Sequence, residues 1–354
     1  MRPSRIRVAL PWLVLCLSVL LVAGTSAREP ATARPAPIGQ DPIVPGAVYA
    51  GDFPDPWIIR VGARYLAYST TSDGVNLPLL ASTNLRTWVA RAETADAPRG
   101  DGLPTLPAWA GATGPWAPSV TRIGTHNFVL AYAVQVAASP GQRMCISLAH
   151  STTPIGPFVD HTAGPAVCPD RGAIDPQVFI TPKGHPWLVW KIDHYPARLY
   201  TQPMNDSATR VRPGFAPRFL AKIRQAWEGH IIENPAMIRF HKRYYLFYSA
   251  NSYASTRYAI GYLICKSWKG DCKRPRKKPL LATGGTIAGP GGPAPFVDRH
   301  GRFRLGYHAW TVGKVGYPTS DACRTSPGGC GQRRLYVATL RVDDRGRLHV
   351  AARY

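Results

Sequence analysis

Acidic residues are scarce in this chain. Asp and Glu together number 20 against 43 Lys and Arg in 354 residues, which gives a net charge of +23. A positive surplus of this size favours contact with anionic polymers over cationic ones. Nucleic acid is the least favoured of these polymers, because the sequence contains no recognition motif for it. With so few acids, the position of each carboxylate becomes informative.

Long hydrophobic runs are missing beyond the N-terminus. Residues 1–27 begin with three arginines, continue with an apolar run and end in small residues, which is typical of a cleaved secretory signal peptide. A membrane anchor is the alternative, but Pro11 interrupts the run, and the run is shorter than the ~20 residues that a spanning helix needs. Residues 28–45 are rich in Pro and Ala and are predicted to form a flexible or extended leader. We therefore expect a secreted protein.

Cysteine is limited to a small even set beyond the signal peptide: Cys145, Cys168, Cys265, Cys272, Cys323 and Cys330. An even number in a secreted chain indicates disulfide bonds. The sequence alone does not fix their connectivity, although proximity favours the pairs 145–168, 265–272 and 323–330. A zinc site is the alternative, but the spacing within the last two pairs is wrong for it.

One pattern occurs five times: a proline, a short apolar run, a turn, and a second apolar run with an aromatic residue. The prolines recur every 58 to 62 residues, at Pro56, Pro118, Pro176, Pro235 and Pro293. An aromatic residue follows each proline by 12 to 14 residues, at Tyr68, Tyr132, Trp190, Tyr248 and Tyr307. A fixed period of this length with strand patterning indicates a propeller or another repeat architecture.

Further strands can be placed in four of the repeats, at 77–88, 145–158, 258–268 and 333–342. These segments are short, rich in β-branched and aromatic residues, and bounded by turn formers. The 35 prolines and 33 glycines suit tight turns and exclude long helices. We predict an all-β fold: a five-bladed β-propeller with four strands in each blade, forming a single domain over residues 46–354.

The residue before each repeat proline is predicted to lie at one mouth of the central channel, because each blade starts with its innermost strand. This column holds Asp55, Ala117, Asp175, Asn234 with Glu233 beside it, and Gly292. Asp before Pro is a common turn former, but three carboxylates at one repeat position favour a functional site. Glycoside cleavage needs one acid to protonate the leaving oxygen and one carboxylate to act on water or on the sugar. A third carboxylate nearby would raise the pKa of the acid by like-charge repulsion.

Aromatic residues near the column are candidates for stacking on the apolar faces of sugars. Trp116 lies beside the column in the second repeat, and His308 lies in the fifth. We predict both to bind substrate. Trp57, Trp190 and Trp310 are further candidates, with packing between blades as the alternative.

At these residues the sequence resembles glycoside hydrolase family 43, the arabinanase and β-xylosidase group of five-bladed propellers. The motifs stand in order over about residues 46–345, as Pro54-Asp55-Pro56, Trp116-Ala117-Pro118, Ile174-Asp175-Pro176 and Glu233-Asn234-Pro235. The resemblance implies an inverting hydrolase with Asp55 as general base and Glu233 as general acid. Asp175 would tune the pKa of the acid and orient it. The implied substrate is an arabinose- or xylose-containing polysaccharide, with arabinose favoured.

The sequence departs from this family at Gly292. Many arabinanases carry a histidine there that serves a central metal, so a calcium held in that way is not expected and no cofactor is predicted. Asp52 and Glu228 lie outside the repeat column and are interpreted as loop residues. Two alternatives remain: a fructan-cleaving relative, whose Asn-Asp-Pro and Glu-Cys elements are absent here, and a carbohydrate-binding propeller without catalysis.

Basic residues cluster in one segment, at Lys266, Lys269, Lys273, Arg274, Arg276, Lys277 and Lys278. The cluster is typical of a solvated loop. The alternative is weak contact with an anionic wall polymer. No partner protein is implied.

Overall fold

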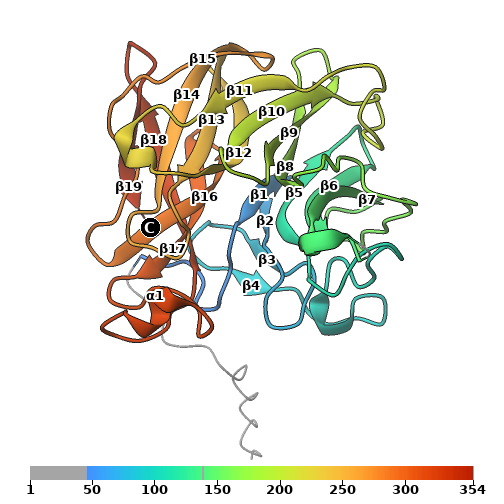
Figure 1. The fold of residues 1–354 in the computed structure, drawn as a ribbon, viewed down its shortest axis with the longest axis horizontal. Coiled ribbons are helices and arrows are strands. Elements are labelled where there is room, and N and C mark those ends of the chain that lie inside the picture. Colours follow the sequence, from blue (N-terminus) through green and yellow to red (C-terminus); the bar gives the residue numbers. More distant parts are fainter. Residues whose placement is uncertain (1–45, 138, 354) are drawn as a thin grey trace, which may run out of the picture. The chain divides into compact units, whose positions relative to one another are not determined.

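Each sequence repeat folds into one antiparallel sheet, and the five sheets form a five-bladed β-propeller (Figure 1). The computed structural model describes residues 46–137 and 139–353. The predicted signal peptide (1–27) and leader (28–45) lie outside the described residues. The all-β prediction is confirmed: the α-helix found in the described part of the chain, α1 (Asp321–Arg324), has only 4 residues.

The strands of every blade follow one another from the inside outward. Blades one and two comprise β1 (Trp57–Val61), β2 (Arg64–Tyr68), β3 (Leu79–Ser82) and β4 (Val89–Ala90), then β5 (Trp116–Arg122), β6 (Phe128–Gln135) and β7 (Met144–Ser151). Blades three and four comprise β8 (Ala173–Ile180), β9 (Pro186–Ile192), β10 (Arg198–Pro203) and β11 (Arg218–Lys222), then β12 (Ile232–Phe240), β13 (Arg243–Ala250), β14 (Ala259–Ser267) and β15 (Gly270–Lys273). Blade five comprises β16 (Ile287–Val297), β17 (Phe303–Thr311), β18 (Arg334–Val342) and β19 (Leu348–Arg353). Short 3-10 turns interrupt the loops at η1 (Pro98–Gly100), η2 (Pro140–Gln142) and η3 (Ala226–Glu228).

The innermost strands close into a ring. β1 contacts β5, β5 contacts β8, β8 contacts β12, β12 contacts β16, and β16 returns to β1; their labels surround the middle of Figure 1. The segment before β1 joins the first blade to the last. The Val48 N–H donates to the Leu335 carbonyl at 2.9 Å, and the Phe53 N–H donates to the Arg333 carbonyl at 2.7 Å. The ring brings five strand starts from distant parts of the sequence to one axis.

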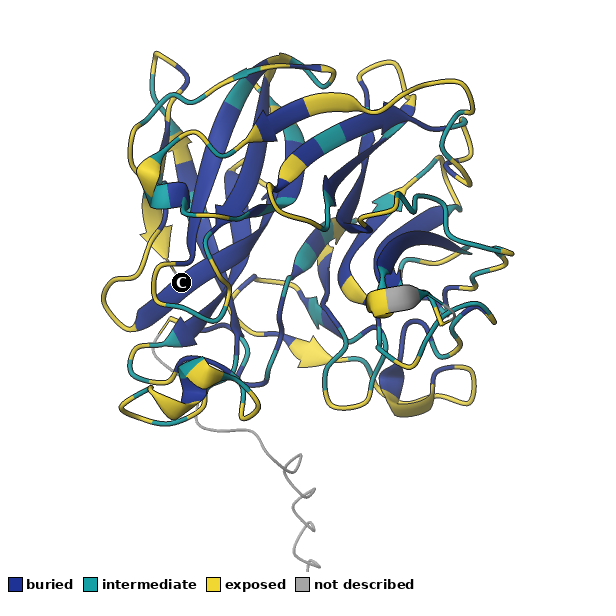
Figure 2. Cartoon of the chain, in the orientation of Figure 1, coloured by how far each residue is buried: buried dark blue, intermediate teal, exposed yellow. Residues whose placement is uncertain are grey.

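The second strand of each blade supplies one aromatic residue to the core. The five repeat aromatics, Tyr68, Tyr132, Trp190, Tyr248 and Tyr307, are all at most 3% exposed. Figure 2 shows buried residues along the strands and exposed ones mainly in the loops. Because burial of apolar side chains is the main favourable term in folding, the aromatic spacing seen in the sequence marks the packing between blades.

Blade two differs from the prediction, since it has three strands and not four. The chain after β7 makes only single bridges to that strand, between His150 and Val159 and between Ile146 and Val167. Pro157 and Pro165 flank these bridges and cannot donate a hydrogen bond to a neighbouring strand. A continuous fourth strand is therefore not formed there.

The three predicted disulfide pairs are confirmed: Cys145–Cys168, Cys265–Cys272 and Cys323–Cys330. Disulfides of this number are typical of proteins that fold in an oxidising compartment, which agrees with an extracellular protein. Within the described residues, no helix has the length and apolar character needed to cross a membrane.

Candidate active site

The five residues before the repeat prolines share one backbone conformation. All have positive φ: Asp55 49°, Ala117 44°, Asp175 55°, Asn234 48° and Gly292 58°. In the four blades where this position lies within a strand, β5, β8, β12 and β16, the pairing register shifts around it. A bulge of this kind turns a side chain away from the ladder, and proline fits beside it because it has no N–H to lose. The repeat thus directs the same backbone position of each blade at the axis, where every blade except the fifth, which has Gly292, presents a side chain.

The ring predicted for these residues is confirmed by a small cavity on the axis. All five column residues and all five repeat prolines line it, and its volume is about 30 Å³. This is roughly the volume of one water molecule, so the column is tightly packed.

Hydrogen bonds between neighbouring blades hold the column. In blades one, two, four and five, an adjacent blade supplies the acceptor for the backbone N–H of the column residue. The Asp55 N–H donates to His308 Nδ1 at 2.9 Å and the Ala117 N–H to Thr70 Oγ1 at 2.8 Å. The Asn234 N–H donates to Asp175 Oδ2 at 2.8 Å and the Gly292 N–H to Ser249 Oγ at 3.0 Å. Closure of the propeller and orientation of the column therefore depend on the same contacts.

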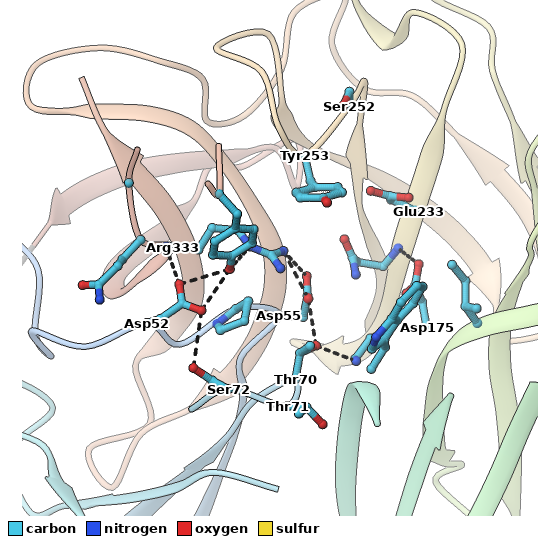
Figure 3. A pocket seen from close by; sticks show the side chains of 18 of the residues that line it. Asp52, Asp55, Thr70, Thr71, Ser72, Asp175, Glu233, Ser252, Tyr253 and Arg333 are labelled. Carbon is cyan, nitrogen blue, oxygen red and sulfur yellow. Dashed lines mark hydrogen bonds and ion pairs between the residues drawn. The ribbon is translucent and has the colours of Figure 1, made fainter. Parts of the chain in front are cut away.

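A much larger cavity, of about 810 Å³, opens above the column and is called here the catalytic cavity. Six acidic residues line it: Asp52, Asp55, Asp73, Asp175, Asp193 and Glu233. Only two cationic residues line it, Lys191 and Arg333. Figure 3 shows Asp55, Asp175 and Glu233 around this space. Nearly a third of the acids of the chain thus meet in one cavity of an otherwise basic protein.

Asp55 is held by two donors. Thr70 Oγ1, just after β2, donates to Asp55 Oδ2 at 2.9 Å. Arg333 Nη1 lies 3.3 Å from Oδ1 and 3.2 Å from Oδ2, as the dashed lines of Figure 3 show. The side chain of Asp55 keeps 14% of its surface exposed. The carboxylate is therefore fixed in orientation and still open to the cavity.

Glu233 is held by a different pair of donors. Lys191 Nζ donates to Glu233 Oε2 at 3.1 Å, and Tyr258 Oη donates to Oε1 at 2.7 Å. Burial and the Glu233 carboxylate raise the pKa of Tyr258 well above its usual range, so the phenol keeps its proton and remains a donor. The side chain of Glu233 is 14% exposed, which leaves it in reach of a ligand.

Asp175 is the most buried of the three carboxylates, with 7% of its surface exposed. Burial raises its pKa to about 8, opposed by the Lys191 ammonium and assisted by the Glu233 carboxylate. Burial alone would lower the pKa of Lys191, but Glu233 and Asp175 outweigh it and raise that pKa. Burial and the Glu233 carboxylate thus favour the protonated form of Asp175, while Lys191 keeps its charge.

The family model of the glycosyl hydrolases family 43 matches residues 45–328. The chain belongs to this family.

Solved structures of family 43 enzymes have the same fold. One, a thermostable family-43 glycoside hydrolase, is 25% identical with a TM-score of 0.70, and the match covers 85% of this chain and 93% of that one. An endo-1,4-β-xylanase from Bacteroides thetaiotaomicron is 24% identical, with a TM-score of 0.67 over 86% of this chain and 96% of that one. An α-L-arabinofuranosidase from Lactobacillus brevis is 18% identical, with a TM-score of 0.65 over 84% and 93%. No curated protein sequence matches the chain. As a family 43 glycoside hydrolase, the protein belongs to a family that inverts the anomeric carbon.

The predicted substrate-binding residues differ in position. Trp116 lines the catalytic cavity and is 39% exposed, so its ring is available to a sugar. His308 is fully buried and does not line this cavity. Its imidazole accepts the Asp55 N–H and stacks on Tyr258 with centroids 5.9 Å apart. The position of His308 therefore differs from the one expected of a substrate-binding residue: it is buried behind Asp55, whose backbone it holds.

The three further tryptophans of the sequence analysis are packing residues or lie outside the cavity. Trp310 is fully buried and donates to the Tyr253 carbonyl at 2.7 Å, while Trp190 is 3% exposed. Trp57 donates to the Val120 carbonyl of the next blade at 2.9 Å. None of the three lines the catalytic cavity.

Two cations that contact the carboxylates of the cavity, Lys191 and Arg333, were not predicted from the sequence. Lys191 directly follows the repeat aromatic Trp190, and the equivalent positions in blades four and five are Ser249 and His308, which also contact the column. The position after the repeat aromatic was thus a usable signal. Arg333 lies 278 residues from Asp55 in the sequence. It belongs to no repeat column, and no spacing in the sequence indicates its contact with Asp55.

The two acids interpreted as loop residues have structural partners. Asp52 accepts the Arg333 N–H at 2.7 Å and the Tyr317 hydroxyl at 3.0 Å, so it supports the arginine that holds Asp55. Burial raises the pKa of Asp52, opposed by Arg333. Glu228, at the end of η3, is fully buried and pairs with Arg274 at 2.6 Å.

Metal binding at the column finds little support in the side chains. Among the described residues, no three His, Cys, Asp or Glu side chains are grouped to hold a metal ion. A side chain at Gly292 would meet His308 Nδ1 at 2.7 Å and the Asp55 Cα at 3.0 Å. The donors at this position do not fit a histidine-linked calcium, and no step of the reaction is assigned to one.

Proposed function

We propose that this protein cleaves arabinosyl or xylosyl linkages in polysaccharide, with Asp55 as general base and Glu233 as general acid. The observation that carries the proposal is the meeting of Asp55, Asp175 and Glu233 on the wall of one 810 Å³ cavity. Inverting cleavage needs two carboxyl groups of opposite role flanking the scissile bond, with room for a water molecule. The different donor sets of Asp55 and Glu233 suit such a division.

The base is proposed to act on water from a fixed orientation. Thr70 and Arg333 both donate to the Asp55 carboxylate, so the ionised group has donors on one side and faces the cavity on the other. Holding a reactant in place in this way lowers the entropic part of the barrier. Arg333 in turn is fixed by Tyr317, whose hydroxyl lies 3.0 Å from Arg333 Nε.

Glu233 is proposed to donate its own proton to the leaving oxygen, with Asp175 and Lys191 setting its surroundings. Asp175 has a pKa of about 8 because it is buried, and it interacts electrostatically with Glu233. Lys191, which contacts Glu233 at 3.1 Å, would hold the Glu233 carboxyl group toward the leaving oxygen, and Glu233 itself would give up the proton. In this proposal Asp175 is a positioning and pKa-tuning residue.

Arabinose is slightly favoured over xylose as the sugar, and Trp116 is proposed as the platform on which the ring lies. Secretion after cleavage of residues 1–27 is part of the proposal, and the three disulfides support it. The alternative in another class is a propeller that binds glycans without turnover.

The test compares wild type, Glu233→Gln and Glu93→Gln on 4-nitrophenyl α-L-arabinofuranoside, 4-nitrophenyl β-D-xyloside and debranched arabinan. Glu93 lies on an exposed loop, so it controls for the loss of one carboxylate. We expect Glu233→Gln to lower kcat/KM on arabinan by about 10²–10⁴, and to act less on the nitrophenyl glycosides, whose leaving group needs no proton.

Two outcomes would contradict the proposal. Full activity of Glu233→Gln on arabinan would show that Glu233 is not the general acid. No turnover of any of the three substrates by wild type would favour glycan binding alone. NMR of the first product formed would show inversion or retention at the anomeric carbon.

A further inference from the structure

A second cavity lies between the segment that follows β15 in blade four and the start of β19 in blade five, and cationic side chains line it. Its volume is about 670 Å³. We call it the basic groove and define it by Gln225, Arg274, Arg276, Lys277, Arg347 and His349. It shares no lining residue with the catalytic cavity, and no acidic side chain of the described residues lines it.

The basic segment of the sequence divides into two parts in the structure. Lys266 is paired with Asp271 at 2.7 Å, and Lys269 lies over the ring of Trp268 at 5.7 Å. These two cations are engaged within blade four. The residues after β15 turn instead toward blade five, where Arg347 joins them from a distant part of the chain.

The groove is built on a fixed backbone. Arg274 forms two contacts with the buried Glu228 carboxylate, at 2.6 and 3.0 Å. Gln225 Nε2 donates to the Arg276 carbonyl at 2.8 Å, and Arg276 Nη1 donates to the Leu348 carbonyl of blade five at 3.3 Å. A site that is already ordered loses less entropy when it binds.

Two of its cations are available to a ligand. Lys277 and Arg347 are exposed, and no hydrogen bond or ion pair to their side chains is found among the described residues. Asp343 contacts His349 at 3.2 Å, but its carboxylate also accepts the N–H groups of Arg345 and Arg347 at 3.0 and 2.8 Å. The groove therefore keeps a positive surplus.

We propose that the basic groove binds a carboxylate-bearing polysaccharide, a polyuronate, at a site separate from catalysis. Guanidinium groups match the geometry of carboxylates, and the volume lies within the range of ligand sites. The lining contains no Phe, Tyr or Trp on which bases could stack, which disfavours single-stranded nucleic acid.

The two cavities differ in charge, which gives the groove a use. The catalytic cavity carries six acids against two cations, so it suits a neutral sugar and repels an anionic one. The groove attracts the anionic part of the same polysaccharide. Polymer held at the groove raises the local concentration of neutral linkages near the catalytic cavity.

The test measures binding of polygalacturonate by calorimetry and affinity electrophoresis. The variant is Lys277→Gln with Arg347→Gln, and the matched control is Lys183→Gln with Arg210→Gln, which removes one exposed Lys and one exposed Arg from blade three. We expect the groove variant to bind about tenfold more weakly, the control to bind as wild type does, and added salt to weaken wild-type binding. Turnover of 4-nitrophenyl arabinofuranoside by both should equal that of wild type.

Three results would overturn the inference. The first is unchanged binding of polygalacturonate by the groove variant. The second is an equal loss of binding in the control variant, which would show an effect of net charge alone. The third is tighter binding of polyphosphate or single-stranded DNA than of polygalacturonate. Because binding is measured directly, the test stands whether or not the proposed glycosidase activity is found.

Discussion

Replacing Thr70 with valine removes one hydroxyl that serves two blades and leaves the shape of the side chain unchanged. That hydroxyl donates to Asp55 Oδ2 at 2.9 Å and accepts the Ala117 N–H at 2.8 Å. A hydrogen bond to a charged group contributes about 1.5–3 kcal/mol. If this energy is needed to hold the base in the transition state, kcat/KM falls about 10- to 100-fold. Arg333 still contacts Asp55, so the lower end of this range is expected.

The same substitution has a separate effect on stability. The Ala117 N–H is buried and would lose its acceptor, which costs about 1–3 kcal/mol. Urea denaturation measures this change, and steady-state kinetics on 4-nitrophenyl arabinofuranoside measures the first one. The matched variant Thr70→Ser keeps the hydroxyl and should retain both activity and most of the stability.

Either of two results would refute this reasoning. A Thr70→Val enzyme with kcat/KM within twofold of wild type would show that Thr70 does not orient the base. A Thr70→Ser enzyme as impaired as Thr70→Val would assign the effect to the lost methyl contact and not to the hydroxyl.

Two further predictions concern the other carboxylate contacts. The pKa of Asp175 is raised to about 8 in the folded protein, whereas the pKa of an unfolded Asp is about 4. Between these two pH values the folded state holds one more proton than the unfolded state. The free energy of unfolding therefore falls as pH rises from about 4 to about 8. Urea denaturation at pH 5 and pH 8 should show a smaller decline for Asp175→Asn than for wild type, and equal declines would contradict the raised pKa. Arg333→Lys keeps the charge but loses the planar guanidinium, whose Nη1 lies close to both oxygens of Asp55 while its Nε contacts Tyr317. We expect kcat/KM to fall about tenfold with KM little changed, and an unchanged kcat would show that Arg333 does not position the base.

Most of the fold could be predicted from two columns of the sequence. The prolines mark the starts of the inner strands, where a residue without an N–H loses no ladder hydrogen bond. The aromatics mark the buried second strands. Blade two shows the limit of this approach. Its fourth strand is missing because prolines after β7 prevent a continuous ladder. A pattern shared by five repeats does not predict a difference that is confined to one of them.

The site could be predicted only as far as it follows the repeat. Asp55, Asp175 and Glu233 were found because they stand at or beside the column. Lys191 stands one residue after a repeat aromatic and was within reach of the same method. Arg333 was not, because its contact with Asp55 depends on how the last blade closes on the first, which is a property of the closed ring and of no single repeat.

Gly292, a column position without a carboxylate, also affects the position of Asp55. Gly292 has φ 58°, and a Cβ there would press on His308 Nδ1 and on the Asp55 Cα. His308 accepts the Asp55 N–H, and burial and Arg333 lower the pKa of His308 well below its usual range, so its ring stays neutral and Nδ1 stays an acceptor. A side chain at position 292 would therefore displace the histidine and then the carboxylate that it positions. In this chain, the absence of a side chain at position 292 leaves the space that His308 needs to hold Asp55.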